Sequence, residues 1–397
     1  MNLNPEFRLR LALRTPLRNR FRLILLCSVL SHVIATAAPV LTEDGFRVPH
    51  ADSVLEFPRA HGSHPDYKIE WWYFTGQLQS ADGRRFGYQA TFFRNAAPLS
   101  DNSSRKGFGD RHLYMAHAAV TDIDRLQFIY EERLNRDGWD AFACSYGMSV
   151  RNGNWTLQMT DPETETMQLN LTVHGHAAMQ LMLTPSKPRI RFGETTNGVS
   201  RKGAHPHATS YYISFTRLQT KGTLILNNEA HEVSGISWMD HEIASRQLSE
   251  ELEGWDWTAI HLDDGREIKA YILRRKDGSP DNYSRLFWIE KDGSYRRWGP
   301  EDFSWQPLRT WKSPSTGITY PIEIILHLPD ELARDAPQRL HLRPLLDHQE
   351  LTGTISGIAY WEGACEVLDA DKGEVIGKAY IELAGYGGGL GAIGGAN

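Results

Sequence analysis

Turn-forming residue pairs divide this chain at short, hairpin-like intervals. Each pair places a glycine after Asp, Asn or Lys, which is typical of the tight turns that join antiparallel strands. The pairs are Asp82-Gly83, Asp137-Gly138, Asn152-Gly153, Asp264-Gly265, Asp277-Gly278, Asp292-Gly293 and Lys372-Gly373. Residues 167–173 alternate apolar and polar side chains, the period of a half-buried strand. The best helix candidate is only the short segment 246–253, so the sequence predicts an all-β fold.

Two segments far apart in the chain have similar patterns. The first runs from Glu70-Trp-Trp72 through Asp82-Gly-Arg84 to Phe93-Arg94, and the second from Trp255-Asp-Trp257 through Asp264-Gly-Arg266 to Leu273-Arg274. Both indicate an aromatic strand, a tight turn and a second strand. Their separation suits one folding unit each. We therefore predict two related β domains, residues 38–228 and 229–388, which join at the polar turn Asn227-Asn228 after a strand at 222–226.

The first 37 residues are predicted to be a cleaved export signal. An Arg-rich segment precedes the apolar run 23–37, and Ala35-Thr-Ala37 offers the small residues required for cleavage near Ala37. The run is shorter than a membrane span, which disfavours an uncleaved anchor. Leu26 directly before Cys27 disfavours lipoprotein processing, because a small residue is needed there. The mature protein is therefore expected in the periplasm or outside the cell.

The last nine residues, 389–397, are predicted to be a flexible Gly-rich tail. Gly389-Leu-Gly391-Ala-Ile-Gly394 formally matches a dinucleotide-binding pattern, but too few residues follow it to form a helix that receives a pyrophosphate. The chain also lacks a Gly-x-Ser-x-Gly elbow and a phosphate-binding Gly-Lys-Ser/Thr loop. Serine-hydrolase and nucleotide-binding functions therefore lose their simplest support.

Net charge and amino-acid composition limit the classes of molecule that the protein is expected to bind. The formal net charge of −6 falls to about −11 without the Arg-rich leader, so nucleic-acid binding, which needs a basic face, is not expected. The 12 Trp, 15 Tyr and 15 Phe residues suit pleated sheets and apolar cavities. Cys144 and Cys365 could pair in an oxidising compartment, but they are too few for a disulfide framework. We favour two buried free thiols.

Four sequence blocks carry a family resemblance. They are Glu70 to Gly76, Trp238-Met-Asp-His-Glu242, Gly254-Trp-Asp-Trp257 and Tyr360-Trp-Glu-Gly363. In this order the blocks are similar to those of the AttH proteins and carotenoid 1,2-hydratases, over roughly residues 56–386. The resemblance implies two lipocalin-like antiparallel β-barrels packed side by side, a cavity for an apolar ligand, and no cofactor or metal. It also makes an ABC transporter a possible partner.

The block around Asp240 is the main candidate for chemistry. On a strand Trp238, Asp240 and Glu242 would share one face, while His241 would lie on the other. Two carboxylates near a tryptophan could leave one acid protonated near neutral pH, and such an acid can protonate an isolated alkene. The alternative is that these acids pair with Arg or Lys across the domain interface.

Asp256 lies between two tryptophans and would face away from both rings. It points outward if Trp255 and Trp257 pack in the core, and it is buried and paired if they line a wet cleft. The resemblance implies a carboxylic acid and a neighbouring histidine as the catalytic groups, which correspond to Asp240, His241 and Asp256. The family commonly continues Asp-His-Glu-Trp-Ser, whereas this chain has Ile243-Ala244, and this departure weakens the prediction of hydratase activity.

Further side chains are predicted to bind the ligand or to support the site. Arg94 and Lys202 could neutralise buried acids or bind an anionic head group. A metal site formed by His61, His64 and Asp66, with or without His205 and His207, has no informative spacing, so no metal is expected. The predicted ligand-binding residues are Glu70, Trp71, Trp72, Tyr211, Tyr212, Trp238, Glu242, Trp255 and Trp257.

Three functions from different classes fit the sequence. The one we favour is an exported lipocalin-like protein that binds a hydrophobic small molecule such as a lipid, terpenoid or polyene, with an ABC transporter as a possible partner. The alternative is a cofactor-free lyase of the carotenoid 1,2-hydratase type that acts on a terpenoid or carotenoid-like alkene by acid catalysis. The third is a purely structural or interaction module. Export and the Ile243 departure favour binding over catalysis.

Overall fold

The computed structural model describes residues 39–97, 112–138, 140–194, 198–388 and 390. The predicted export signal lies outside these residues, as does the predicted tail apart from Leu390. Strands dominate, which confirms the all-β prediction. The helical segments in the described part of the chain are two short 3-10 turns, η1 (Arg59–His61) and η3 (Asp330–Leu332). None of the helices described is long and apolar enough to cross a membrane.

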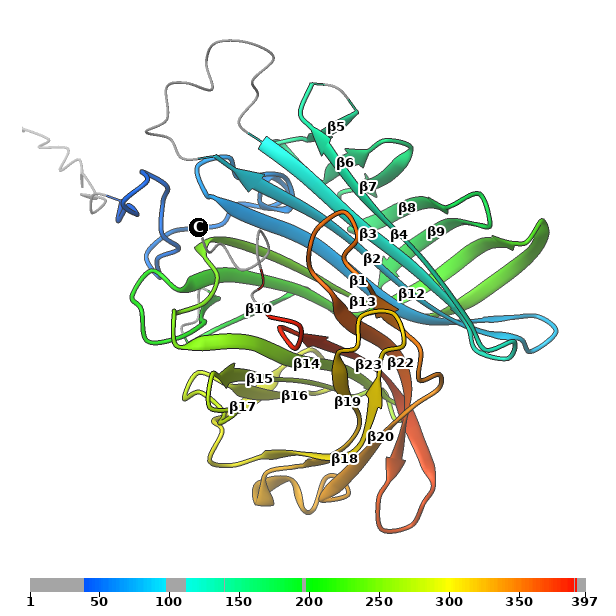
Figure 1. The fold of residues 1–397 in the computed structure, drawn as a ribbon. Helices are drawn as coiled ribbons and strands as arrows, with labels where there is room; N and C mark the ends of the chain where they lie inside the picture. The colour runs from blue at the N-terminus through cyan, green and yellow to red at the C-terminus, as the bar shows by residue number, and fades with distance from the viewer. Residues whose placement is uncertain (1–38, 98–111, 139, 195–197, 389, 391–397) are drawn as a thin grey trace, which may run out of the picture. The chain divides into compact units, whose positions relative to one another are not determined.

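The first sheet has 13 strands and curls into a nearly closed barrel (Figure 1). Its order is β4-β3-β2-β1-β13-β12-β9-β8-β7-β6-β5, with β10 and β11 also paired to β12. The edge strand β4 lies against β5, β6 and β8 from the other end of the sheet. Its strands are β1 (Ile69–Ser80), β2 (Arg85–Ala96), β3 (His112–Asp122), β4 (Gln127–Arg136), β5 (Ala141–Ala143), β6 (Ser149–Asn152), β7 (Trp155–Asp161), β8 (Thr166–Val173), β9 (Ala177–Pro185), β10 (Ile190–Phe192), β11 (Val199–Arg201), β12 (Thr209–Leu226) and β13 (Glu229–Arg246).

The second sheet has 10 strands and forms a half-barrel (Figure 1). Its order is β17-β16-β15-β14-β23-β22-β20-β19-β18, and β21 pairs with β22. Its strands are β14 (Leu252–Leu262), β15 (Glu267–Arg275), β16 (Arg285–Ile289), β17 (Tyr295–Trp298), β18 (Ser304–Lys312), β19 (Thr319–His327), β20 (Arg339–Pro344), β21 (Glu350–Leu351), β22 (Tyr360–Asp369) and β23 (Val375–Ala384). Both sheets are antiparallel, as the sequence predicts.

The turn chemistry follows the sequence closely. The glycine of every predicted turn has a positive φ, from 63° at Gly153 to 93° at Gly265, a region that only glycine enters at low cost. The alternating segment 167–173 lies in β8, whose side chains alternate between buried and half-buried. The segment 246–253 is not a helix. It ends β13, turns at 247–251 and begins β14, because the chain there crosses from one sheet to the other.

The change of sheet lies later than the predicted domain join. Asn227 and Asn228, with φ of 51° and 68°, form the turn between β12 and β13, and both of these strands belong to the first sheet. The chain enters the second sheet only after Arg246. A tight turn between two long strands keeps those strands paired, so the turn does not separate the sheets. The division into two domains stays a prediction.

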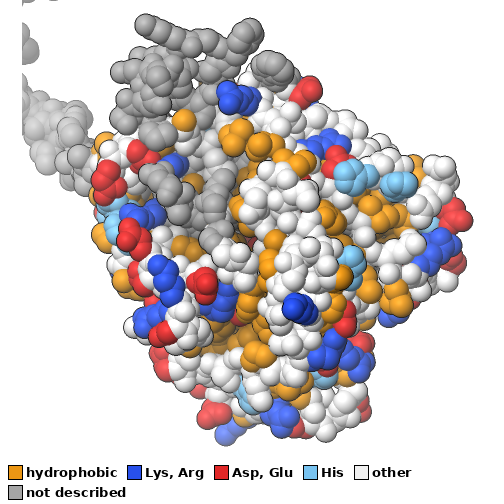
Figure 2. Space-filling view, in the orientation of Figure 1, with side chains coloured by type: hydrophobic (Ala, Val, Ile, Leu, Met, Phe, Trp, Pro, Cys, Tyr) orange, Lys and Arg blue, Asp and Glu red, His pale blue; other side chains and the backbone are white. Residues whose placement is uncertain are grey.

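Strand β1 is buried on both faces and explains how the two sheets meet. Trp72 and Phe74 belong to the core inside the first barrel, whereas Trp71 and Tyr73 belong to a second cluster that includes Trp257 from β14. A third cluster fills the second sheet. Alternation along one strand therefore supplies side chains to the barrel core and to the interface between the sheets. On the face shown in Figure 2, basic and acidic side chains are interspersed.

Candidate functional site

A pocket opens in the interface cluster between the two sheets. It holds about 750 Å³ of space outside the atoms, including the part that opens to solvent. Strands β1, β2, β12 and β13 contribute one wall, and β14, β15, β22 and β23 contribute the other. The lining residues are Trp71, Tyr73, Thr91, Phe93, Lys202, Tyr212, Asp240, Glu242, Gln247, Trp255, Trp257, Tyr271, Leu273, Ile358, Tyr360, Glu362, Glu382, Ala384 and Leu390. Aromatic walls with a few converging polar groups are typical of small-molecule sites.

Asp240 is buried in this pocket and is held by neutral donors. Its Oδ1 accepts hydrogen bonds from the Ser214 hydroxyl and, at 2.7 Å, from Trp238 Nε1. Its Oδ2 accepts a hydrogen bond from the Tyr212 hydroxyl at 2.7 Å, and Trp257 Nε1 lies 3.2 Å from that same hydroxyl. Both carboxyl oxygens are thus used to position aromatic side chains of the pocket.

Glu242 lies on the same face of β13 as Asp240, as predicted from strand alternation. Lys202 Nζ lies 3.0 Å from its Oε2, and the Ser210 hydroxyl donates to the same oxygen. The structure therefore pairs Glu242 with a basic side chain, as in the structural alternative, but Lys202 follows β11 of the same sheet and the pair does not cross between the two sheets. Lys202 also lies over the ring of Tyr212, 4.3 Å from the ring centroid.

Two further acids face the pocket from the end of the chain. Glu362 on β22 and Glu382 on β23 are direct cross-strand neighbours. Glu362 is fully buried and accepts a hydrogen bond from the Tyr73 hydroxyl at 2.6 Å, and burial raises its pKa well above the usual value. Burial also raises the pKa of the half-buried Glu382 to about 7, and the charges of Asp240 and Glu242 add to this shift. The pocket thus contains a carboxylic acid, Glu382, that is partly neutral near pH 7.

A phenol and an imidazole connect the pocket to strand β3, because Tyr360 lines the pocket and His117 is the cross-strand neighbour of the lining residue Thr91. The Tyr360 hydroxyl lies 2.8 Å from Nδ1 of His117 and donates to it when that nitrogen is unprotonated. His117 Nε2 and Glu132 Oε1 are buried and have no hydrogen-bond partner among the described residues, and His117 and Glu132 are cross-strand neighbours. Burial lowers the pKa of His117 to about 4, while the Glu132 charge opposes this shift. The Tyr360 hydroxyl and the His117 ring thus form a hydrogen-bonded pair beside the pocket, in which the imidazole is neutral near pH 7.

His241 and Glu70 lie on the opposite face of the sheet, away from the pocket. His241 Nε2 lies 2.9 Å from Oε1 of Glu70 and its ring stacks on Trp72 at 4.8 Å. Glu70 also contacts His64 Nδ1 at 2.9 Å and Arg94 Nε at 3.0 Å. Burial alone would raise the pKa of Glu70, but Arg94 and the two histidines hold it well below the usual value. These side chains form a buried ionic network.

Asp256 is also turned away from the pocket. It is buried, forms an ion pair with Arg274 and accepts a hydrogen bond from the Tyr386 hydroxyl at 3.0 Å. Strand alternation places Trp255 and Trp257 on the pocket face and Asp256 behind them. Of the sequence alternatives for this residue, the structure shows the buried and paired one. Arg94 and Arg274, which correspond in the internal repeat, both neutralise a buried acid.

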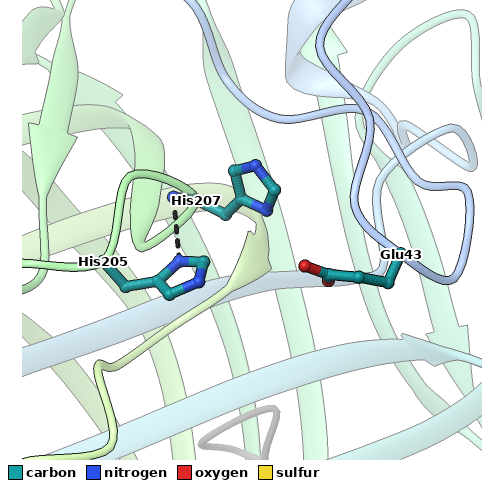
Figure 3. Close-up of side chains that lie close together, drawn as sticks. All are labelled: Glu43, His205 and His207. Carbon is teal, nitrogen blue, oxygen red and sulfur yellow. Dashed lines mark hydrogen bonds between the residues drawn. The ribbon is translucent and has the colours of Figure 1, made fainter.

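Two groups of side chains bring three potential metal ligands together. One comprises His64, Glu70 and His241, in which Glu70 is already bound by Arg94. The other comprises Glu43, His205 and His207, shown in Figure 3. There His205 Nδ1 accepts a hydrogen bond from the backbone N–H of His207 at 3.1 Å (Figure 3), and its Nε2 lies 3.3 Å from Nη1 of Arg246. A basic side chain competes with a cation in both groups.

The structure therefore divides the predicted site residues between two faces. The pocket contains the predicted residues Asp240, Trp71, Tyr212, Glu242, Trp255 and Trp257. Trp238 supports the pocket through Asp240. The residues that do not line it are His241, Asp256, Glu70, Trp72 and Tyr211. Tyr211 instead donates a hydrogen bond from its hydroxyl to the backbone oxygen of His50 at 3.1 Å.

Ile243 lies on the His241 face, not in the pocket. It packs with Tyr67, Val199, Tyr211 and Ile213. An aromatic side chain at this position would not contact the pocket, because successive residues of β13 face opposite ways. The departure at Ile243 therefore takes no aromatic group from the pocket, and the argument that it weakens catalysis there is wrong.

Cys144 and Cys365 are free thiols, as we expected; Cys365 is buried, whereas Cys144 is only half-buried.

Fold and site together define a tandem lipocalin-like β protein with an aromatic pocket between its sheets. A model of the AttH-like family matches residues 48–386. The chain therefore belongs to the AttH-like family, as the four sequence blocks predict. A comparison with curated proteins gives no match.

Solved structures agree with this assignment. A protein from Nitrosomonas europaea that is assigned to AttH is 33% identical, with a TM-score of 0.73 over 84% of this chain and 98% of its own. Kievitone hydratase from Nectria haematococca is 12% identical, with a TM-score of 0.60 over 87% of this chain and 96% of its own. At that identity, the second structure supports the fold alone.

Proposed function

We propose that the protein binds a hydrophobic small molecule, such as a lipid, terpenoid or polyene, in the pocket between the sheets. The observation that carries this proposal is the aromatic lining: Trp71, Trp255 and Trp257 face the same space from both sheets. Large rings supply apolar contact area, and the converging carboxyl and phenol groups can orient a polar end of the ligand.

Tryptophan fluorescence tests ligand binding. Oleate, farnesol and a C20 polyene should be titrated separately, and at least one should quench the emission saturably. Trp255→Ala should weaken that affinity by about tenfold, because it removes an aromatic wall of the pocket. Trp311→Ala is the matched control, since Trp311 is also half-buried but lies on the edge strand β18 outside the pocket. No saturable change with any ligand would contradict the proposal.

A second candidate is a cofactor-free lyase that adds water to an apolar alkene. The observation that favours it is the Glu362–Glu382 pair, since a neutral carboxylic acid can give its proton to an isolated double bond. The resulting carbocation would be stabilised by the surrounding ring faces. Water would then attack the cation, and the proton that the water loses would return to the carboxylate that protonated the alkene, which regenerates the acid. Kievitone hydratase is named for a reaction of this class, which agrees with the candidate.

We also propose that the protein is exported and works with an ABC transporter. The N-terminal sequence supports export, and the family resemblance supports the transporter. N-terminal sequencing of periplasmic or secreted material should show a chain that begins near Ala38; an intact Met1 in a cytoplasmic fraction would disprove export. Co-purification from membranes of the native host tests the transporter, and the absence of any transporter subunit would contradict that part.

A further inference from the structure

Acidic groups without a basic partner gather in the interface pocket. Asp240, Glu362 and Glu382 form no ion pair with any described residue. Among the described residues, the hydrogen-bond donors to Asp240 are a hydroxyl, an indole and a phenol, and the donor to Glu362 is a phenol. Tyr73, which binds Glu362, is the cross-strand neighbour of Asp240, so these acids face one another across a short part of the pocket.

The nearby lysines form no ion pair with these three acids among the described residues, although the charge of Lys202 opposes the raised pKa of Glu382. Lys202 is bound to Glu242, which leaves that pair without net charge. Lys269 is fully buried, and its Nζ lies 2.9 Å from the ring centroid of Tyr212 and 4.1 Å from that of Phe192. Its Nζ has no hydrogen-bond partner among the described residues, and burial lowers its pKa well below the usual value, although the charges of Asp240 and Glu242 oppose this shift.

The walls around the acids suit a positive charge. Aromatic ring faces attract cations, and the attraction grows when the cation is desolvated. Carboxylates supply the opposite charge, so a cation can enter this apolar space without the usual penalty of burying an unpaired charge. The aromatic residues that line the pocket are Trp71, Tyr73, Phe93, Tyr212, Trp255, Trp257, Tyr271 and Tyr360.

We propose that the pocket selects apolar ligands that carry a positive charge, such as a hydrophobic amine in its protonated form or a quaternary ammonium compound. This inference rests on the proposed binding function, because it concerns the same pocket. A cation beside Glu382 would favour the ionised form of this acid, so binding near neutral pH should release protons. The titratable and charged groups that face Glu382 around the pocket are Glu362, Tyr360, Asp240, Glu242, Tyr73, Tyr212, Tyr271 and Lys202.

Two isosteric probes test the charge preference. Benzyltrimethylammonium and neopentylbenzene have the same shape, and only the first is charged. Calorimetry on the full chain should show that the cation binds about tenfold more tightly at pH 7. Repeating the titration in buffers with different ionisation enthalpies should show proton release for the cation alone. The affinity for the cation should also rise between pH 6 and pH 8, whereas that for neopentylbenzene should not.

Two variants test whether Glu382 is responsible for the preference for the cation. Glu382→Gln should reduce the preference for the cation and the number of protons released. Glu366→Gln should not, since Glu366 binds Arg343 away from the pocket. Equal affinities for the two probes without proton release would overturn the inference, while saturable quenching by oleate, farnesol or the polyene would leave the binding function intact. If Glu382→Gln does not fold, the pH dependence of the unaltered protein decides alone.

Discussion

Replacing Arg94 with methionine is expected to lower the free energy of unfolding by about 3–5 kcal/mol. Arg94 Nε lies 3.0 Å from Oε2 of Glu70, and both side chains are fully buried. Its guanidinium also donates to the backbone oxygens of His64 and Tyr67, at 3.0 and 2.8 Å. Methionine keeps most of the apolar stem but leaves the Glu70 carboxylate without its cation in the interior.

Arg343→Met is the matched control for this loss. Arg343 forms an ion pair with Glu366, but its side chain is 46% exposed, so its removal should cost less than about 1 kcal/mol. Denaturant unfolding of both variants, followed by circular dichroism, measures the difference. Equal stabilities of the two variants would show that the buried Arg94–Glu70 pair contributes no more to the free energy of unfolding than the exposed Arg343–Glu366 pair.

Much of the fold follows from local sequence alone. An Asp-Gly or Asn-Gly pair specifies a turn whatever surrounds it, so the hairpins around Gly83 and Gly265 are predictable. The same is true of strand faces. Because side chains alternate with a period of two, the sequence separates Asp240 from His241 without knowledge of the tertiary structure.

Local sequence patterns do not predict the residue at which the chain passes from the first sheet to the second. The turn at Asn227-Asn228 looks like any other hairpin, and only the pairing of β13 with β1 shows that the chain remains in the first sheet beyond it. Pairing between strands more than 150 residues apart leaves no local pattern. The crossing segment 247–251 lies inside the stretch 246–253, which the sequence alone offers as its best helix candidate.

The sequence analysis did not identify Glu382, because long-range strand pairing, which has no local sequence pattern, places it in the pocket. It lies in an ordinary alternating strand, and it faces the pocket only because β23 pairs with β14 and places it opposite Trp257. Glu362 did have a signal, since it belongs to the Tyr360-Trp-Glu-Gly363 block. Glu70 and Trp72 belong to the Glu70 to Gly76 block and were predicted to bind the ligand, but they do not line the pocket. The sequence does not show which face of β1 meets the second sheet, because both faces of this strand are apolar.

Asp240 and Glu382 are the two acids of the pocket that compete for the role of proton donor in a lyase reaction. The sequence favours Asp240 as the proton donor, but Asp240 accepts three hydrogen bonds that occupy both of its oxygens. Asp240→Asn would turn an amide N–H towards at least one of these donors, so its effects on stability and on turnover cannot be separated. Glu382 borders open pocket space, and its raised pKa lets it carry a proton near neutral pH.

If the protein is a lyase, Glu382→Gln should lower turnover by about 100-fold or more, because glutamine keeps the shape but cannot donate the proton. Turnover is measured as water added to an acyclic terpenoid or carotenoid, detected by mass spectrometry, with Glu366→Gln as the control. The rate of the unaltered enzyme should fall as the pH rises through about 7, since Glu382 must be protonated to act. Turnover that survives in Glu382→Gln with the same pH profile would assign the proton donation to another group. Saturable ligand quenching without any turnover in the unaltered protein would leave binding as its function.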